Sequence, residues 1–302
     1  MTRVYGSPEA FKQALEKRLR GDAETTGAEF VRKRQLLVFD RFLARVVAVF
    51  GDAATLKGGL ALELRIERAR TTKDIDLRIA GSPHDTLARL QDASRRNLGD
   101  FMNFEVGTDE GHPEIRNEGM PYDGLRFRAV CKLAGKPYGQ PFGVDVAFGE
   151  PMLDKPEIVV ADDVLAFAGI AAPTLHLYPI ETHIAEKLHA YTLPRMRPNT
   201  RVKDLPDIAL LATVKKQLDA ARVRAALEQT FTFRNTHPLP AAVPAPLESW
   251  RAPYEALARG DGLAWSTLEA VTAAVRAFLD PVLAGPFAGT WQPARSRWRI
   301  RG

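Results

Sequence analysis

Two aspartates at alternate positions, Asp74 and Asp76, are the residues of this sequence best suited to chemistry. They begin a segment, residues 74–79, in which polar and apolar side chains alternate strictly, as in a half-buried strand. Residues two apart on a strand share a face, so the two carboxylates should project side by side. Unpaired carboxylates this close repel each other, and a divalent cation with oxygen ligands would relieve the repulsion. The alternative is a pair of surface acids in ion pairs with Arg70, Lys73 or Arg78.

A diglycine and a third aspartate could complete such a site. The sequence Lys57-Gly58-Gly59 lies between a short strand-like piece and a helical run, where backbone N–H groups can approach a phosphate. A plain turn is the alternative interpretation of this diglycine. Asp145 alternates with apolar residues on a predicted strand and could hold a cation or accept a proton from an attacking hydroxyl. Taken alone, Asp145 could equally be an exposed strand acid.

The second half of the chain offers a lysine and an aspartate, each with an ordinary structural explanation. Lys187 lies in the middle of a predicted helix, where a solvated helix face would account for it. Asp204 precedes Leu205-Pro206-Asp207 and could simply cap a helix. A basic loop between two helices could contact an RNA backbone, or could be soluble surface; its cations are Arg195, Arg197, Arg201 and Lys203. The basic tail at 295–301 could track a nucleic acid or form an edge strand.

The elements that must position these residues change in character at about residue 160. Before that point, helices are expected at 8–20, 27–50 and 82–98, and strands at 55–57, 74–79, 125–133 and 142–148. After it, helices are expected at 162–170, 179–193, 205–214, 220–229 and 266–279. Residues 238–253 hold five prolines and predict an extended strap. The pattern predicts an α/β (α+β) lobe over 1–160, followed by a mainly helical lobe over 161–302.

Composition excludes several classes of protein. The 302 residues include 42 Lys and Arg against 37 Asp and Glu, a net charge of +5, and 45% are hydrophobic, which excludes a wholly disordered chain. The single cysteine, Cys131, permits neither an intrachain disulfide nor a cysteine-based zinc site. The longest apolar run is about ten residues, far below the roughly 20 of a membrane helix. Glu9 and Glu16 interrupt the N-terminal segment where a signal peptide would be apolar, so we expect a cytoplasmic protein.

Taken together, the motifs resemble the polymerase-beta-like nucleotidyltransferase superfamily, and more narrowly the AbiEii/MenT group of toxin nucleotidyltransferases. The resemblance begins with Gly58-Gly59, the stretch 70–77 around the two aspartates, and Val144-Asp145-Val146. The narrower match comes from the second half of the chain. It is carried by residues 181–190, 201–207 and 233–237, followed by the proline strap and Trp250.

This resemblance implies a metal-dependent transfer of a nucleoside monophosphate from an NTP. It implies a mixed catalytic sheet in the first lobe, with Mg²⁺, two ions in number, held by Asp74, Asp76 and Asp145. Lys57, Gly58, Gly59 and Lys187 would bind the triphosphate, and Lys187 and Asp204 would match the group's additional essential lysine and aspartate. The implied partners are an RNA 3′ end, with the tRNA acceptor end the first choice, and a cognate antitoxin.

Two departures and two other functions stay open at this point. Gly59 and Leu60 stand where the superfamily often has Ser and many AbiEii-like chains have Thr, and Pro206 stands where an aromatic residue is frequent. The same catalytic core could instead modify a protein hydroxyl or a small molecule. A helical binding module that merely retains the strand acids is the non-enzymatic alternative.

Overall fold

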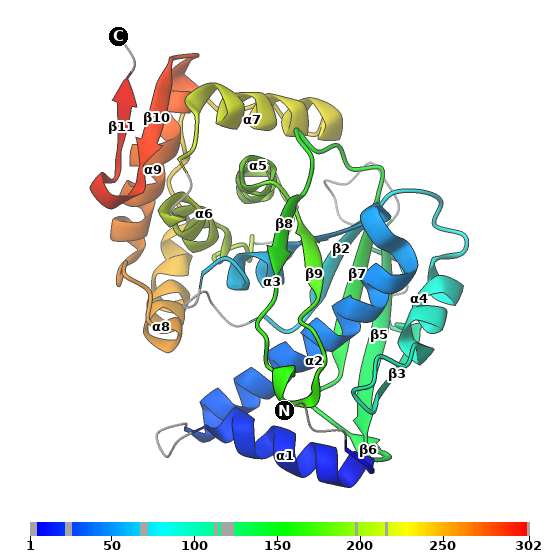
Figure 1. Ribbon diagram of the computed structural model, residues 1–302. Helices are drawn as coiled ribbons and strands as arrows, with labels where there is room; N and C mark the ends of the chain where they lie inside the picture. The colour runs from blue at the N-terminus through cyan, green and yellow to red at the C-terminus, as the bar shows by residue number, and fades with distance from the viewer. Residues whose placement is uncertain are drawn as a thin grey trace.

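The computed structural model describes residues 5–21, 26–66, 72–111, 114–115, 124–196, 199–214 and 217–300. Arg70, Arg197 and Arg301, three of the cations considered above, lie outside these ranges. The chain folds into a sheet-based lobe and a helical lobe, which lie side by side in Figure 1. The predicted fold class, a mixed α/β lobe followed by a mainly helical one, is confirmed.

A mixed sheet forms the first lobe, in the order β3-β5-β7-β2-β1-β9-β8, with the short strands β4 and β6 also paired to β5. Its strands are β1 (Ala54–Lys57), β2 (Ile75–Ile79), β3 (Met102–Thr108), β4 (Glu114–Ile115), β5 (Gly124–Leu133), β6 (Lys136–Pro137), β7 (Phe142–Phe148), β8 (Glu157–Val160) and β9 (Thr174–Leu177). Two pairs, β2 with β7 and β1 with β9, run parallel, and the other pairs run antiparallel. The central position of β2 between β1 and β7 places the two predicted acidic strands next to each other.

Helices cover one face of this sheet, in front of it in Figure 1: α2 (Gly27–Phe50) and α4 (Thr86–Arg95), with α1 (Pro8–Arg20) packed against α2. A reciprocal capping box between Thr26 and Glu29 begins α2, which satisfies backbone N–H groups that a helix start leaves unpaired. Alternation along β2 buries Ile75, Leu77 and Ile79 in the apolar core that α2 helps to form. The polar positions of β2 therefore face the other way, toward the helical lobe.

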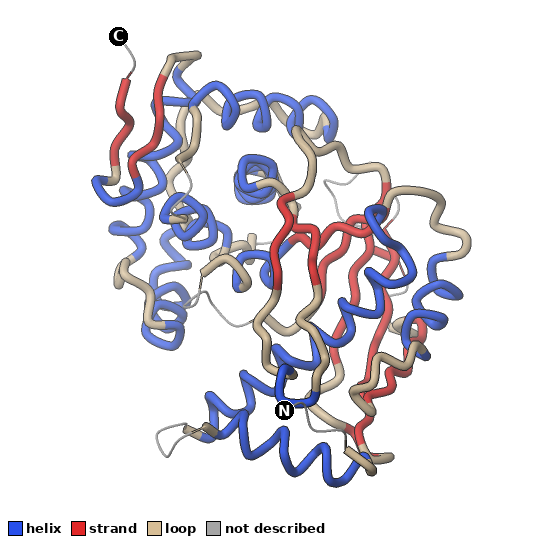
Figure 2. The backbone as a smooth tube through the Cα atoms, in the orientation of Figure 1, coloured by secondary structure: helices blue, strands red, loops and turns tan. Residues whose placement is uncertain are grey.

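The helical lobe is built around α5, with other helices packed about it (Figure 2). Its helices are α5 (Ile180–Thr192), α6 (Asp204–Thr213), α7 (Ala220–Arg234), α8 (Arg251–Asp261) and α9 (Leu268–Ala284). A second apolar core joins them, and a short helix of the first lobe, α3 (Gly58–Glu63), contributes Leu62 to it. A terminal hairpin of β10 (Gly289–Gln292) and β11 (Arg297–Ile300) packs on α9, so the basic tail forms an edge strand as one of the two alternatives predicted.

Two predictions about elements are wrong. Residues 162–170 form only a short 3₁₀ turn at Ala166–Ala168, and β8 and β9 flank it as a hairpin. The first apolar core extends past residue 160, because it includes Leu175 and Leu177 of β9. The strap ends before residue 248, because η3 (Glu248–Trp250) and α8 follow it.

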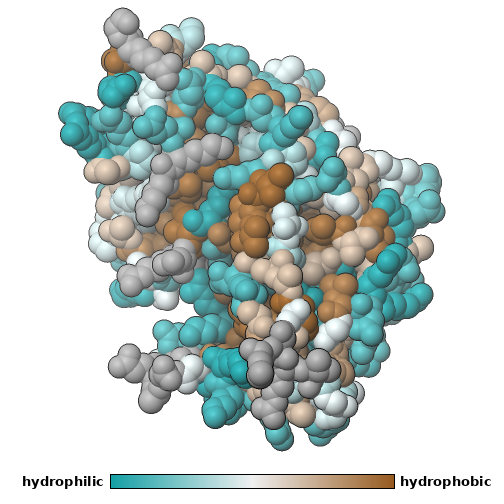
Figure 3. Space-filling view, in the orientation of Figure 1, coloured by the Kyte–Doolittle hydropathy of each residue, from teal (hydrophilic) through white to brown (hydrophobic). Residues whose placement is uncertain are grey.

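The hairpin also leaves an apolar edge. Ile158 and Val160 on β8 are 68% and 64% exposed, and apolar surface gathers over this part of the molecule in Figure 3. Among the described residues, none of the helices has both the length and the hydropathy that crossing a membrane requires.

Candidate active site

A cleft of about 530 Å³ opens between the polar face of the sheet and the helical lobe. Its walls include every site residue predicted from the sequence: Lys57, Gly58, Gly59, Asp74, Asp76, Asp145, Lys187 and Asp204. Residues more than a hundred positions apart in the chain therefore meet at one place. These residues differ in burial and in their hydrogen-bond and ion-pair partners, and these differences decide the chemical role open to each.

A row of charged residues crosses the sheet at the cleft. Strand pairing aligns Lys57 of β1 with Asp76 of β2, Asp76 with Asp145 of β7, and Asp145 with Arg126 of β5. Neighbouring strands are about 4.8 Å apart, so side chains in such a row touch their neighbours. Asp74 lies one residue before β2 rather than on it, and its Oδ1 accepts a hydrogen bond of 3.1 Å from the Gly143 backbone N–H.

Asp76 is the reactive member of this row by its environment. Burial and the negative charge of Asp145 raise its pKa to about 6, although Lys57 and Lys187 oppose the shift. Within the described parts of the chain, its carboxylate has neither a hydrogen-bond partner nor an ion-pair partner. Gly58 makes room for it: a Cβ at Gly58 would lie 1.9 Å from Asp76 Oδ2.

Gly58, the first residue of the diglycine, is therefore required by both backbone conformation and packing. Gly58 adopts φ +67°, a left-handed conformation that side chains disfavour. α3, which starts there, is only 6 residues long, and no side chain among the described residues caps its start. The backbone N–H groups of its first turn are thus the phosphate-binding groups that the turn can offer, and the dipole of so short a helix adds little.

Asp145 is held by an arginine that the sequence analysis did not single out. Arg126 donates from Nε to Oδ1 at 2.7 Å and from Nη2 to Oδ2 at 2.6 Å, a bidentate pair. Among the described residues, no three His, Cys, Asp or Glu side chains already form a metal-binding group, so the predicted three-carboxylate cluster is not preformed.

The donor chemistry of this row nevertheless fits a divalent cation. Asp76 and Asp145 are adjacent hard-oxygen donors, and the mutual repulsion that raises the Asp76 pKa is what a cation would relieve. A cation held there would draw on carboxylate oxygens that now accept hydrogen bonds from Arg126 and from the Gly143 backbone N–H.

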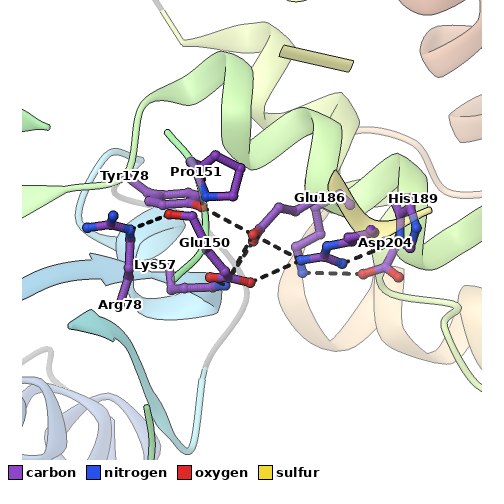
Figure 4. A network of polar contacts seen from close by, with 10 residues as sticks. Lys57, Arg78, Glu150, Pro151, Tyr178, Glu186, His189 and Asp204 are labelled. Atoms are coloured by element: carbon purple, nitrogen blue, oxygen red, sulfur yellow. Dashed lines mark hydrogen bonds and ion pairs between the residues drawn. The ribbon is translucent and has the colours of Figure 1, made fainter. Parts of the chain in front are cut away.

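A buried network of four charges forms one end of the cleft (Figure 4). The Lys57 ammonium contacts Glu150 and lies 3.1 Å from Glu186, while Arg234 lies 3.2 Å from Glu150 and 3.0 Å from Glu186. Tyr178 donates a hydrogen bond of 3.2 Å to Glu186. Although Glu186 is buried, Lys57 and Arg234 lower its pKa to about 2. Lys57 is thus committed to two carboxylates, which argues against the predicted role in binding triphosphate.

Sequence reasoning gave no role to Glu150, Glu186 or Arg234. Glu186 and Arg234 fall inside the stretches that carried the family resemblance, and Glu150 follows β7 two residues after its end. In the sequence, these three residues share only one feature: each is a charged residue next to a predicted core helix or strand. Their pairing across three segments is a property of the tertiary structure.

Lys187 and Asp204 meet at the helical wall of the cleft. The Lys187 ammonium, on α5, lies 3.3 Å from Asp204 and 2.7 Å from Asp207, both on α6. Its side chain is 14% exposed, so the solvated-face explanation is wrong. Asp204 is buried as the first residue of α6, and no side chain caps that helix start among the described residues, so the capping explanation is also wrong. Burial raises the pKa of Asp204, while Lys187 opposes the rise.

Other cationic side chains at the cleft have fewer or longer ion pairs. Within the described residues, Lys73 and Lys203 have no ion-pair partner, and Arg201 lies at 4.0 Å from Asp204. His183 also lines the cleft, and neither of its ring nitrogens has a hydrogen-bond partner among the described residues. Burial and the nearby Lys187 lower its pKa to about 3, so its ring is neutral. The cleft therefore offers free positive charge at its rim and a neutral imidazole deeper in its wall.

The chain is similar to solved structures, and it matches one protein family. Among solved structures, MenT4, a nucleotidyltransferase toxin from Mycobacterium tuberculosis H37Rv, has a TM-score of 0.53 at 18% identity, over 90% of this chain and 98% of that chain. JHP933 from Helicobacter pylori has a TM-score of 0.41 at 14% identity, over 80% and 91% of the two chains. No curated protein matches. The profile of the nucleotidyl transferase AbiEii toxin family, a type IV toxin–antitoxin system, matches residues 41–280. By that match, which spans both walls of the cleft, the chain belongs to the AbiEii family of nucleotidyltransferase toxins.

Proposed function

We propose that this nucleotidyltransferase moves a nucleoside monophosphate from an NTP to the 3′ end of an RNA, with the tRNA acceptor end as its substrate, and so blocks translation. The observation that carries the proposal is the cleft in which Asp76 and Asp145, aligned on neighbouring strands, face Lys187 and Asp204 of the helical lobe. Family membership supports the reaction type and sets aside a passive binding module.

In the reaction, the RNA 3′ oxygen forms a bond to the α-phosphorus of the NTP, and the bond to pyrophosphate breaks. Asp74, Asp76 and Asp145 would hold two Mg²⁺ ions, which would neutralise the negative charge that develops in the reaction. Asp145 would also accept the proton of the attacking hydroxyl.

The chain's own cations would divide the binding of phosphate between them. The first N–H groups of α3, beside Gly58 and Gly59, would donate to the triphosphate. Lys73, Arg201 and Lys203 are the available cations at the rim, and Lys187 would add its field from the wall. Polyanions such as NTP and RNA suit this rim better than a neutral small molecule does, which supports an RNA acceptor over the small-molecule alternative.

The toxin–antitoxin family assignment implies a cognate antitoxin that relieves the block. NTP and tRNA pools are cytoplasmic, so we place the activity in the cytoplasm.

A labelling assay tests the proposal. Purified protein is incubated with total tRNA, Mg²⁺ and each α-labelled NTP in turn, and the RNA is resolved on a denaturing gel. Wild type should label tRNA with at least one NTP, and Asp76→Asn should not. The control is Asp92→Asn, which changes an exposed carboxylate on α4 and should label normally. Label that persists in Asp76→Asn contradicts the proposal, and label that enters only protein in a lysate moves the acceptor to a protein hydroxyl.

A further inference from the structure

Arg126 is a charged residue at the cleft that the proposed reaction leaves unused. It stands at the outer end of the row Lys57, Asp76, Asp145, Arg126, which crosses four neighbouring strands in register. The two ends of this row behave differently. Lys57 turns its ammonium to Glu150 and Glu186, whereas Arg126 turns its guanidinium inward along the row. Asp145 therefore has its direct counter-charge in Arg126, whereas Asp76 has no ion-pair partner among the described residues.

Arg126 engages both oxygens of Asp145, at 2.6 and 2.7 Å. A carboxylate held in this bidentate way has its oxygens directed at the guanidinium rather than at the neighbouring Asp76. A divalent cation shared by Asp76 and Asp145 needs those same oxygens. A guanidinium and a metal ion at one carboxylate also repel each other, so the two cations compete for Asp145.

The ion pair is built so that it can open. The Arg126 side chain is 37% exposed and that of Asp145 is 18% exposed, so the guanidinium can move into solvent without leaving a buried charge behind. This differs from Arg45 and Asp100 in the first lobe, whose side chains are both 0% exposed and whose pairing is structural. Arg126 lines the cleft itself, so a polyanion bound there offers it a new partner.

We propose that Arg126 is a displaceable counter-ion of the cation site, which holds Asp145 when no divalent cation is bound and turns to the triphosphate when cation and NTP arrive together. This inference rests on the proposed function, since it needs Asp76 and Asp145 to be cation ligands. Its consequence is coupling between the two ligands. Cation binding alone must break the ion pair, whereas NTP gives the guanidinium another anion, so each ligand strengthens the binding of the other.

Direct cation binding by the full chain tests this role without an activity readout. Mn²⁺ is the probe, and the electron paramagnetic resonance signal of free Mn²⁺ is followed during titration of wild type, Arg126→Gln and Arg128→Gln. Arg128 is the matched control, because it lies two residues along β5, is exposed, and pairs in the strand register with Gly143 rather than Asp145. Both variants lose one positive charge near the site, so the difference between them reports the ion pair alone.

Arg126→Gln should bind Mn²⁺ about tenfold more tightly than wild type, which corresponds to about 1.4 kcal/mol for a partly exposed bidentate pair, and Arg128→Gln should stay within about twofold. Equal affinities for the two variants, or weaker binding by Arg126→Gln, would overturn the proposal. Asp76→Asn separates this failure from that of the cation site. If it removes saturable Mn²⁺ binding while Arg126→Gln fails to tighten it, only the counter-ion role is wrong. If no variant and no wild-type sample binds Mn²⁺, the cation site of the proposed function is wrong as well.

Discussion

The charge on Asp76 should make the free protein less stable, and removing it should therefore stabilise the fold while abolishing activity. Burial and Asp145 raise the Asp76 pKa from 3.8 to about 6. A shift of roughly 2 units corresponds to about 3 kcal/mol of penalty for the ionised form. Since the cleft is open to solvent on one side, we expect Asp76→Asn to raise the free energy of unfolding at pH 8 by roughly 1 to 3 kcal/mol.

The pH dependence distinguishes this cause from any other. An unfolded aspartate has a pKa near 3.9, so between about pH 4 and pH 6 the folded chain holds a proton at Asp76 that the unfolded chain has lost. Stability from this group is present below about pH 4 and falls as pH rises to 6, above which the penalty is constant. The difference between Asp76→Asn and wild type should therefore be near zero at pH 4 and largest above pH 6.

Urea unfolding, followed by circular dichroism at several pH values, measures this difference. Asp92→Asn, a change at a carboxylate whose side chain is 61% exposed, is the control and should shift stability little at any pH. Saturating MgCl₂ should then stabilise wild type and leave Asp76→Asn unchanged, because the ligand is lost. Lower stability of Asp76→Asn at pH 8, or a difference that persists unchanged at pH 4, would refute the reasoning.

Three further outcomes follow from the cleft. Gly58→Ala should lower activity at least about 100-fold and the free energy of unfolding by roughly 1 to 2 kcal/mol. The new Cβ would clash with Asp76 Oδ2, and the φ of +67° strains any residue that has a side chain. Labelling of tRNA by this variant at the wild-type rate would contradict the prediction. Lys187→Ala should reduce the free energy of unfolding by about 3 to 5 kcal/mol, because it removes the ammonium that pairs with two buried carboxylates. Lys187→Arg should retain most of that stability, and urea midpoints decide between the two outcomes. Glu186→Gln should destabilise by about 3 kcal/mol or more, because it weakens the pairing of Lys57 and Arg234, and a thermal shift of less than a degree would disprove this.

Sequence patterns predicted local structure well where periodicity was strong. Helices at 8–20 and 27–50 were predicted at the bounds that the structure has, because both begin at clear caps and carry apolar residues at helical spacing. The strand 75–79 followed from alternation that buries one face. Residues 162–170 were predicted as a helix in error, because a short apolar run looks alike in a buried helix and in the turn of a hairpin.

The site was predictable as a set of residues but not as a set of contacts. Alternation on predicted strands found Asp74, Asp76 and Asp145, and resemblance assigned roles to Lys187 and Asp204; all five line one cleft. Pairing could not be predicted, because it depends on strand order: only the neighbourhood of β5 and β7 brings Arg126 to Asp145. The burial of His183 without a hydrogen-bond partner among the described residues is visible only in three dimensions.

The way the charges are paired separates the parts of the cleft that hold it together from the parts that can react. Lys57 and Arg234 are 13% and 9% exposed and are shared between the same two glutamates, so a ligand would have to break two buried pairs to recruit either one. The Arg126 pair is more exposed, and Asp76 has no pair among the described residues. The free-energy cost of breaking an ion pair is thus highest in the network at Glu150 and Glu186 and lowest near Asp76. Substrate and cation should therefore bind where the pairing is weakest, between Asp76, Asp145 and the rim cations, while the four-charge network keeps the two lobes at a fixed distance.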